Sequence, residues 1–149
     1  LNRTAWLDSG VENYPRATTG SYLYEQEFGY DNDGSPMTNV FIESSDVDID
    51  DGENFAFINR IIPDIKFLSN SSAGKVNLVL KTRDYPGDTL TTASTSQIAA
   101  DTSKTDIRAR ARQITFRLES DDDAGSSGND NVGWRLGATR LNVQPDGRR

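Results

Sequence analysis

The chain has 149 residues, the length of one ordinary domain with room for a buried core. Its formal net charge is −7 and its isoelectric point is near 4.5, so the basic footprint of a nucleic-acid-binding domain is missing. Because it contains no cysteine and no histidine, the sequence excludes disulfides, thiolate metal sites and a Ser-His-Asp triad.

The sequence predicts an all-β chain. No segment shows sustained apolar spacing at i, i+3, i+4 and i+7. Short alternating runs between turn residues instead favour an antiparallel β-sandwich of roughly seven to nine strands with long loops. We expect residues 1–20 to form an irregular N-terminal arm or linker, with Trp6 and Tyr14 packed on a neighbouring surface, and residues 21–149 to form the sandwich domain. Since the chain begins at Leu1 rather than Met, we expect a processed chain or part of a longer polypeptide.

The expected strands follow in chain order. Turn chemistry marks residues 30–36, and Pro63 interrupts an apolar run, which indicates an edge strand or a strand start. Residues 89–105, rich in Thr, Ser and Ala, predict a weak strand and a surface loop. The other strands before position 106 are predicted at 21–28, 40–42, 46–50, 55–58, 60–62, 65–67 and 76–83.

Residues 107–143 carry most of the information in the chain. Two long strand-like runs, 107–119 and 132–143, flank an acidic, glycine-rich segment at 120–131. That segment is too polar to pack, so we interpret the two runs as a hairpin with a long tip.

The first of these runs changes its apolar face. Side chains on a strand alternate between the two faces of a sheet. The even-numbered positions of this run nevertheless hold three arginines followed by three apolar residues. The apolar face of the strand therefore switches sides near residues 111–113. This switch requires a bulge, a twist or a change of neighbouring strand. The residues at the even-numbered positions are Arg108, Arg110, Arg112, Ile114, Phe116 and Leu118.

The arginine stripe formed by Arg108, Arg110 and Arg112 is the least ordinary feature of the sequence. Like charges about 6 to 7 Å apart repel unless something acidic covers them. The stripe could track phosphates, or it could pair with carboxylates of this chain or of an adjacent subunit. An ordinary ion-pair ladder within one sheet explains it equally well. The negative net charge favours acidic protein over DNA as the partner.

Clusters of carboxylates raise the question of a calcium site or an acid pair. Residues 31–34 resemble the opening of a calcium loop, but no glutamate follows at the required position. In residues 46–52 the apolar Val47 and Ile49 instead predict a half-buried strand with a solvated acidic face and a turn. Nothing marks two of the acids as a glycosidase pair. We therefore expect no cofactor, no metal and no enzymatic activity.

Trp134 has two interpretations. A tryptophan on such a strand usually fills the core between two sheets, which we favour. It could instead be a sugar-stacking platform, assisted by Tyr22, Tyr24, Tyr30 and Tyr85. This second interpretation gives an alternative function, a carbohydrate- or receptor-binding β-sandwich module.

Several motifs resemble the C-terminal signature of bacteriophage virion proteins of the tail nozzle or tail tubular kind, found in short-tailed phages. The strongest are Arg-Ala-Arg-Gln at 110–113, Leu-Glu-Ser-Asp at 118–121, Gly-Trp-Arg-Leu-Gly at 133–137, Arg-Leu-Asn-Val at 140–143 and Pro-Asp-Gly-Arg-Arg at 145–149. Further similar segments are 1–8, 24–29, 50–52 and 61–64. The resemblance covers nearly the whole chain and departs from the signature at the acidic insertion 121–131.

The resemblance implies a virion structural protein that forms a ring of identical subunits, with a hexamer as one candidate, and that contacts neighbouring tail or adaptor proteins. DNA would pass through the ring without specific binding, because an acidic lumen repels phosphates. The segment 121–131 would lie on the surface or in the lumen, and no membrane contact is expected. The residues that we expect at subunit interfaces are Arg108, Arg110, Arg112, Trp134, Arg135 and Arg140.

Overall fold

The computed structural model describes residues 3–10, 12–32, 35–37, 39–48, 53–68, 74–121 and 133–147, with only the backbone of residues 31, 32, 35 and 36. Within these ranges the chain forms fifteen strands and no helix, and every strand pair is antiparallel. The predicted all-β antiparallel fold is confirmed. There are more strands than the predicted seven to nine, because several pairings involve only two to four residues.

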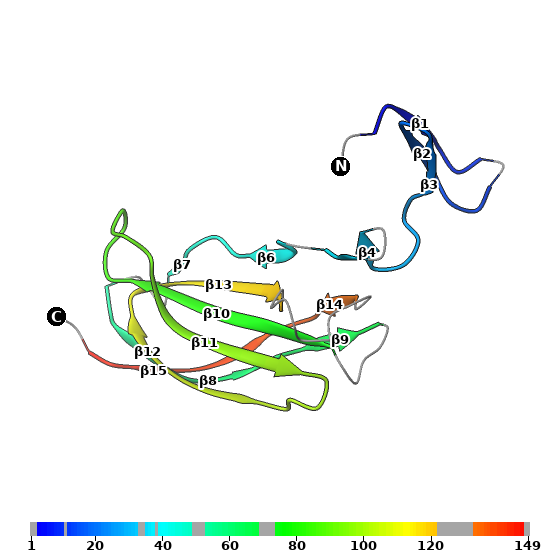
Figure 1. Ribbon diagram of the computed structural model, residues 1–149. Coiled ribbons are helices and arrows are strands. Elements are labelled where there is room, and N and C mark those ends of the chain that lie inside the picture. The colour runs from blue at the N-terminus through cyan, green and yellow to red at the C-terminus, as the bar shows by residue number, and fades with distance from the viewer. Residues whose placement is uncertain are drawn as a thin grey trace.

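Two sheets stack to form the sandwich (Figure 1). The first sheet has the order β11-β10-β13-β6, with β7 also pairing with β13. The second has the order β12-β8-β15, and the β14–β9 pair extends it. The first contains β6 (Phe41–Glu43), β7 (Val47–Asp48), β10 (Lys75–Arg83), β11 (Thr91–Ala99) and β13 (Gln113–Ser120); the second group contains β8 (Ala56–Ile62), β9 (Ile65–Phe67), β12 (Thr105–Ala111), β14 (Trp134–Leu136) and β15 (Arg140–Pro145).

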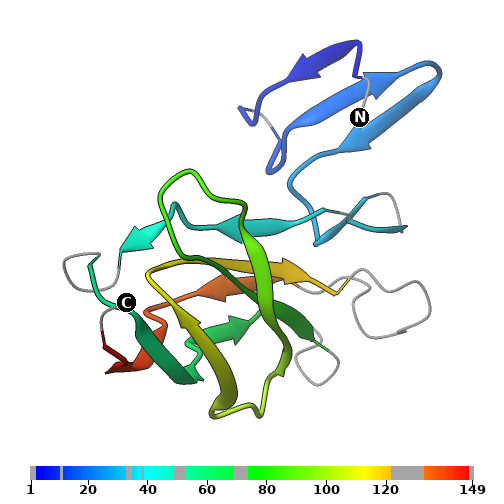
Figure 2. The same cartoon turned by 90° about the vertical axis from the view of Figure 1, so that its left-hand side faces the viewer.

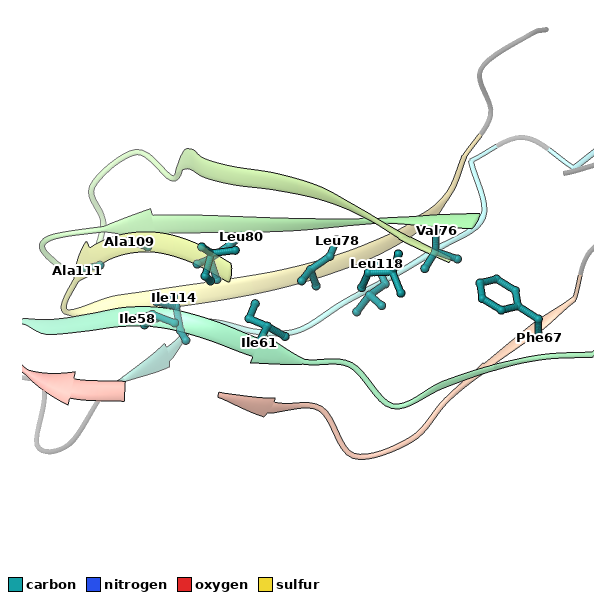
Figure 3. Close-up of a cluster of buried hydrophobic side chains, with 12 residues drawn as sticks. Ile58, Ile61, Phe67, Val76, Leu78, Leu80, Ala109, Ala111, Ile114 and Leu118 are labelled. Atoms are coloured by element: carbon teal, nitrogen blue, oxygen red, sulfur yellow. The ribbon is translucent and has the colours of Figure 1, made fainter. Parts of the chain in front are cut away.

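The core lies between these sheets. Alternate residues of β10, β13, β8 and β12 point inward and interdigitate, as Figure 3 shows for Leu78, Leu80, Leu118 and Ile61. Each fully buried Ile or Leu contributes about 1.5–3 kcal/mol relative to an exposed one. The buried cluster comprises Ile58, Ile61, Phe67, Val76, Leu78, Leu80, Ile98, Ile107, Ala109, Ala111, Ile114 and Leu118.

The predicted change of apolar face is confirmed, and its cause is a change of neighbouring strand. The chain bends at Arg112 between β12 and β13. β12 pairs with β8 in the second sheet, whereas β13 pairs with β10 in the first. Because the two sheets face each other, the chain must present the opposite parity to the same core after it crosses over.

The predicted hairpin between residues 107–119 and 132–143 is wrong. β13 has β10 on one edge and β6 with β7 on the other, so no edge is left for the C-terminal run. That run is divided instead into β14, which pairs with β9, and β15, which pairs with β8. β8 therefore separates β12 from β15 within the second sheet.

The prediction of an irregular segment over residues 1–20 is also wrong. β1 (Ala5–Leu7), β2 (Arg16–Thr19) and β3 (Tyr22–Glu25) form a three-stranded sheet that crosses the expected boundary at 20/21. Gly20, with a φ of 57°, permits the tight β2–β3 turn. In Figures 1 and 2 this sheet lies to one side of the sandwich, and the short β4 (Asp31–Asn32) and β5 (Ser35–Pro36) follow it.

Two further expectations need revision. The weak strand within residues 89–105 is the nine-residue β11, which pairs along most of β10. Its Thr and Ser side chains suit an exposed edge strand, and Ile98 alone supplies a large side chain to the core. The runs at 55–58 and 60–62 are one strand, β8, since Asn59 continues the chain between them.

Candidate assembly surface

The outer face of the second sheet gathers arginines from adjacent strands. Ile107, Ala109 and Ala111 point into the core, so Arg108 and Arg110 point to the opposite side. On β15 the half-buried Leu141 packs against the core, and the neighbouring Arg140 is exposed. The tertiary structure therefore brings Arg140 onto the same face as the predicted stripe.

Arg110 and Arg112 have partners within the chain. Arg110 donates from Nε to a carboxylate oxygen of Asp146, and from Nη2 to the backbone carbonyl oxygen of Asp146 at 3.3 Å. The guanidinium carbons of Arg110 and Arg112 lie 4.0 and 4.8 Å from the centre of the Phe55 ring, and that of Arg112 lies 5.2 Å from the Tyr85 ring. This part of the stripe stabilises the sheet edge through an ion pair and cation–π contacts.

Arg108, Arg135 and Arg140 are different, because none of them forms a hydrogen bond or ion pair with a residue that the structure describes. Arg135 is also directly opposite Lys66 on β9. Like charges opposite each other on a sheet repel. These cations are therefore available to a ligand or to another chain.

Trp134 is half-buried and packs against the core, which confirms the favoured interpretation. Its indole Nε1 donates a hydrogen bond to the hydroxyl oxygen of Ser120 at 3.0 Å. Of the four tyrosines that could have assisted a sugar platform, Tyr30 lies beside Trp134, because a methyl group added at the preceding Gly133 would clash with the Tyr30 ring. The other three belong to different parts of the chain. Tyr22 and Tyr24 belong to β3, and Tyr85 follows β10.

The outer face of the first sheet carries a continuous polar ladder that sequence reasoning missed. Glu43 on β6 accepts from Lys81 Nζ at 2.7 Å and from Arg117 Nη1 at 3.3 Å, and Arg117 Nε donates to Glu119 at 2.6 Å. The hydrogen bond from Lys81, followed by that from Arg117, lowers the pKa of Glu43, although partial burial opposes this shift. Hydrogen bonds to Glu119 and then Glu43 raise the pKa of Arg117.

The acidic strand before residue 49 belongs to the same ladder. Asp46 accepts from the Thr115 hydroxyl at 2.7 Å and forms an ion pair with Arg83, and Asp48 accepts from the Gln113 amide. The alternation of Asp46 and Asp48 was the available signal, but their partners lie 69 and 65 positions away. Among the described residues, no group of three or more His, Cys, Asp or Glu could hold a metal ion.

Not all of the predicted acidic features can be placed. Residues 49–52, 33–34 and 122–132 lie outside the described residues, as do the side chains of 31 and 32. Asp121, which begins the acidic insertion, is 5% exposed, and its carboxylate accepts from Gln97 Nε2 at 2.7 Å. The start of this insertion is therefore anchored to β11 rather than solvated.

The N-terminal sheet exposes large apolar side chains on both of its faces. By register, Trp6 and Tyr24 lie on either side of the buried Ala17, whereas Leu7 and Leu23 belong to the opposite face. Trp6, Leu7 and Leu23 are 55%, 65% and 62% exposed, so the predicted packing of Trp6 on a neighbouring surface is not found among the residues that the structure describes. Tyr14 does pack, edge-on, against Phe28 with ring centroids 5.3 Å apart.

Comparison with known proteins adds no relative: no protein-family model matches the chain, and no curated protein matches it significantly. The resemblance to phage tail proteins therefore stays a prediction, carried by the motifs of the sequence alone. Within the described ranges, no helix is long and apolar enough to cross a membrane.

Proposed function

We propose that the chain is a non-enzymatic structural domain of a phage tail, a nozzle- or tube-type component of the virion that assembles with copies of itself. The single observation that carries this proposal is the N-terminal sheet, a single layer with exposed apolar side chains on both faces. A three-stranded sheet needs a packed layer on at least one face to be stable. A layer supplied by another subunit meets this need.

The layer that we propose is the sandwich of a second copy, and charge complementarity supports this choice. Residues 3–30 contain four carboxylates, Asp8, Glu12, Glu25 and Glu27, and two arginines. Arg16 is already engaged with Glu12 at 3.2 Å and Glu25 at 3.4 Å. The second sheet and its β14–β9 extension offer Arg135 and Arg140, which have no partner among the described residues.

Such a contact joins two different surfaces of the same chain. Contacts of this kind form rings when the rotation closes. A ring is the assembly that the sequence motifs predict, with a hexamer as one candidate, and its neighbours would be other tail or adaptor proteins. The net charge of −7 suits the passage of DNA without specific binding, because the excess of carboxylates repels the phosphates.

The test is the mass of the purified chain in solution, measured by light scattering at low and high salt. We expect a ring-sized species at low salt that dissociates as salt rises, because salt screens the charge contacts. The variant Trp6→Ser/Leu7→Ser/Leu23→Ser should be monomeric at every salt concentration. A matched control is Tyr85→Ser, a change at a 56% exposed aromatic of the sandwich, which should keep the assembly.

A wild-type chain that stays monomeric at every salt and protein concentration would contradict self-assembly. Assembly that survives the triple substitution would contradict the role given to the N-terminal sheet. Binding of duplex DNA at moderate salt would contradict passage without adhesion, and a filter-binding assay on the same samples measures it.

A further inference from the structure

An apolar groove of about 250 Å³ lies at one edge of the sandwich, between β6 and β13 of the first sheet and β14 and β15 of the second. It coincides with the break between β14 and β15, since Gly137 and Thr139 from this break also line it. We call this hollow the edge groove. Its apolar lining consists of Ile42, Phe116, Leu118, Leu136 and Leu141.

The edge groove is accessible and large enough for an aliphatic side chain. Ile42 at its rim is 50% exposed, whereas Leu118 is buried in the core. An apolar cavity of about 150 Å³ holds a benzene molecule. A groove of about 250 Å³ can therefore take the side chain of a leucine, which is smaller than benzene.

The exposed apolar side chains of the N-terminal sheet belong to two different faces. The aromatic face carries Trp6 and Tyr24, and the guanidinium carbon of Arg3 lies 4.0 Å from the centre of the Tyr24 ring. The aliphatic face carries Leu7 and Leu23. Either face could supply an apolar side chain, so charge has to distinguish them.

Charge favours the aliphatic face. Arg16 and Glu25, the charged residues of β1, β2 and β3, are directly opposite each other on this face. Arg16 contacts Glu12 at 3.2 Å and Glu25 at 3.4 Å. Two carboxylates thus share one guanidinium, and one negative charge is left over. The aromatic face, in contrast, carries the cation of Arg3.

A cation stands beside the edge groove. Arg140 lies between Thr139 and Leu141, which both line the groove. It forms no hydrogen bond or ion pair with a residue that the structure describes. Because β15 is an edge strand of the second sheet, the outer face that carries Arg140 meets the groove at this edge.

Of the two leucines on the aliphatic face, Leu23 suits the groove better. Leu23 and Glu25 are two positions apart on one strand, about 7 Å from the strand rise. Leu7 is instead directly opposite the cation of Arg16. Entry of Leu23 therefore brings a carboxylate toward Arg140, whereas entry of Leu7 brings a guanidinium.

We propose that Leu23 of a second copy enters the edge groove and that Glu25 of that copy pairs with Arg140. This inference rests on the proposed function, which supplies the contact between copies through the N-terminal sheet, and it names the residues on each side of that contact. The contact joins two different surfaces, so it repeats from copy to copy.

The test is disulfide cross-linking, and the chain offers a clean background because it has no cysteine. Leu23→Cys and Ile42→Cys chains are mixed under mild oxidation, and covalent dimers are measured on non-reducing gels. A disulfide needs Cα atoms within about 7 Å of each other. We expect dimers in the mixture and not in either variant alone, because the contact pairs residue 23 with residue 42.

The matched control replaces Ile42→Cys by Val47→Cys. Val47 is 43% exposed and lies on β7, which pairs with the same edge of β13 as β6, but it does not line the groove. We expect no covalent dimer between Leu23→Cys and Val47→Cys.

Two substitutions measure what the contact contributes to assembly, with light scattering over a range of protein concentrations as the readout. Ile42→Ser should weaken assembly by about 5-fold or more, since it removes apolar wall from the groove, and Val47→Ser should not. Arg140→Gln should weaken it by about 2- to 5-fold at low salt, and Arg108→Gln, away from the groove, should not. All four changes are at exposed side chains, and thermal unfolding confirms that each variant folds.

The proposal is overturned if the mixture of Leu23→Cys and Ile42→Cys forms no more dimer than the Val47→Cys control, or if Ile42→Ser assembles like the wild type. The double variant Leu23→Cys/Ile42→Cys gives a further check. An intrachain disulfide in it, seen as a faster-moving monomer, would overturn the proposal, because the sheet of the same chain would then fill the groove.

The two measurements separate this contact from the proposed function. Assembly in light scattering without the cross-link would overturn the contact and leave self-assembly standing. The cross-link without a ring-sized species would support the contact and contradict the ring.

Discussion

The sandwich and the N-terminal sheet treat their apolar residues in opposite ways. The sandwich buries Ile58, Ile61 and Val76 completely between two sheets. The N-terminal sheet leaves Trp6 and Tyr22 55% and 70% exposed on one layer. β1 and β2 show no regular polar–apolar alternation, so their sequence did not predict a sheet, and it did not say whether a second layer covers it.

This difference separates the part of the chain that provides stability from the part that provides contacts. The sandwich folds around its own core and satisfies its outer polar groups with the ladder centred on Glu43 and Arg117. The N-terminal sheet, in contrast, still lacks an apolar surface to pack against its exposed side chains. Substitutions should therefore act on unfolding in one region and on association in the other.

The largest effect should come from Leu78→Ala in the sandwich core. Leu78 is 2% exposed and lies at the centre of the cluster in Figure 3. We expect the free energy of unfolding to fall by about 2–5 kcal/mol, because truncation removes buried methyl groups and leaves a cavity. Urea unfolding measures it. A loss below about 1 kcal/mol would mean that the two sheets are not closely packed there.

A smaller loss should follow Gly74→Ala, which tests the packing of the sandwich end. A methyl group at Gly74 would lie 2.5 Å from Cδ1 and 2.9 Å from Cγ of Phe67, a ring that is itself buried. Because the ring has little room to move, we expect a loss of about 1–3 kcal/mol. Gly10→Ala is the matched control, since a methyl group there meets nothing within 4 Å.

Acid should weaken the sandwich through the polar ladder. The folded-state pKa of Glu43 is lowered from its ordinary value of 4.5, mainly by the hydrogen bond from Lys81. Its stabilisation is therefore complete above that value and is lost as the pH falls through the lowered folded pKa. Urea midpoints at about pH 6 and about pH 3 should differ less in Glu43→Gln than in the wild type.

The control for this pH effect is Glu27→Gln, at an exposed carboxylate outside the ladder. It should keep the wild-type difference between the two midpoints. An acid dependence in Glu43→Gln as large as that of the wild type would show that other carboxylates carry it.

The smallest effect on unfolding should come from Leu23→Ser in the N-terminal sheet. Leu23 is 62% exposed, and surface changes of this kind usually alter the free energy of unfolding by less than about 0.5 kcal/mol. Measured on dilute, dissociated protein, the urea midpoint should stay at the wild-type value. A loss comparable to that of Leu78→Ala would show that the sheet packs within its own chain after all.

Much of the local structure was predictable from the residues. Alternation placed β10 and β13, and the shared parity of Arg110 and Ile114 showed that the chain must change its surroundings near Arg112. These features depend on the period-2 geometry of a strand, which any short window of sequence records.

The partner of each strand was not predictable in the same way. The hairpin expected between residues 107–119 and 132–143 does not form, because β10 and β6 occupy both edges of β13. Partner choice depends on which long-range arrangement buries the most apolar surface at the lowest cost in chain entropy, and no local pattern encodes that sum.

The sequence by itself thus determined the all-β class, most strand positions and the unusual arginine stripe. Only the tertiary structure decided that Arg110 pairs with Asp146 while Arg108 has no partner among the described residues, that Glu43 meets Arg117 from 74 positions away, and that the pairings of β12 and β15 with β8 both change register at Asn59. Those outcomes follow from strand register, which is set between distant segments when the two sheets pack together.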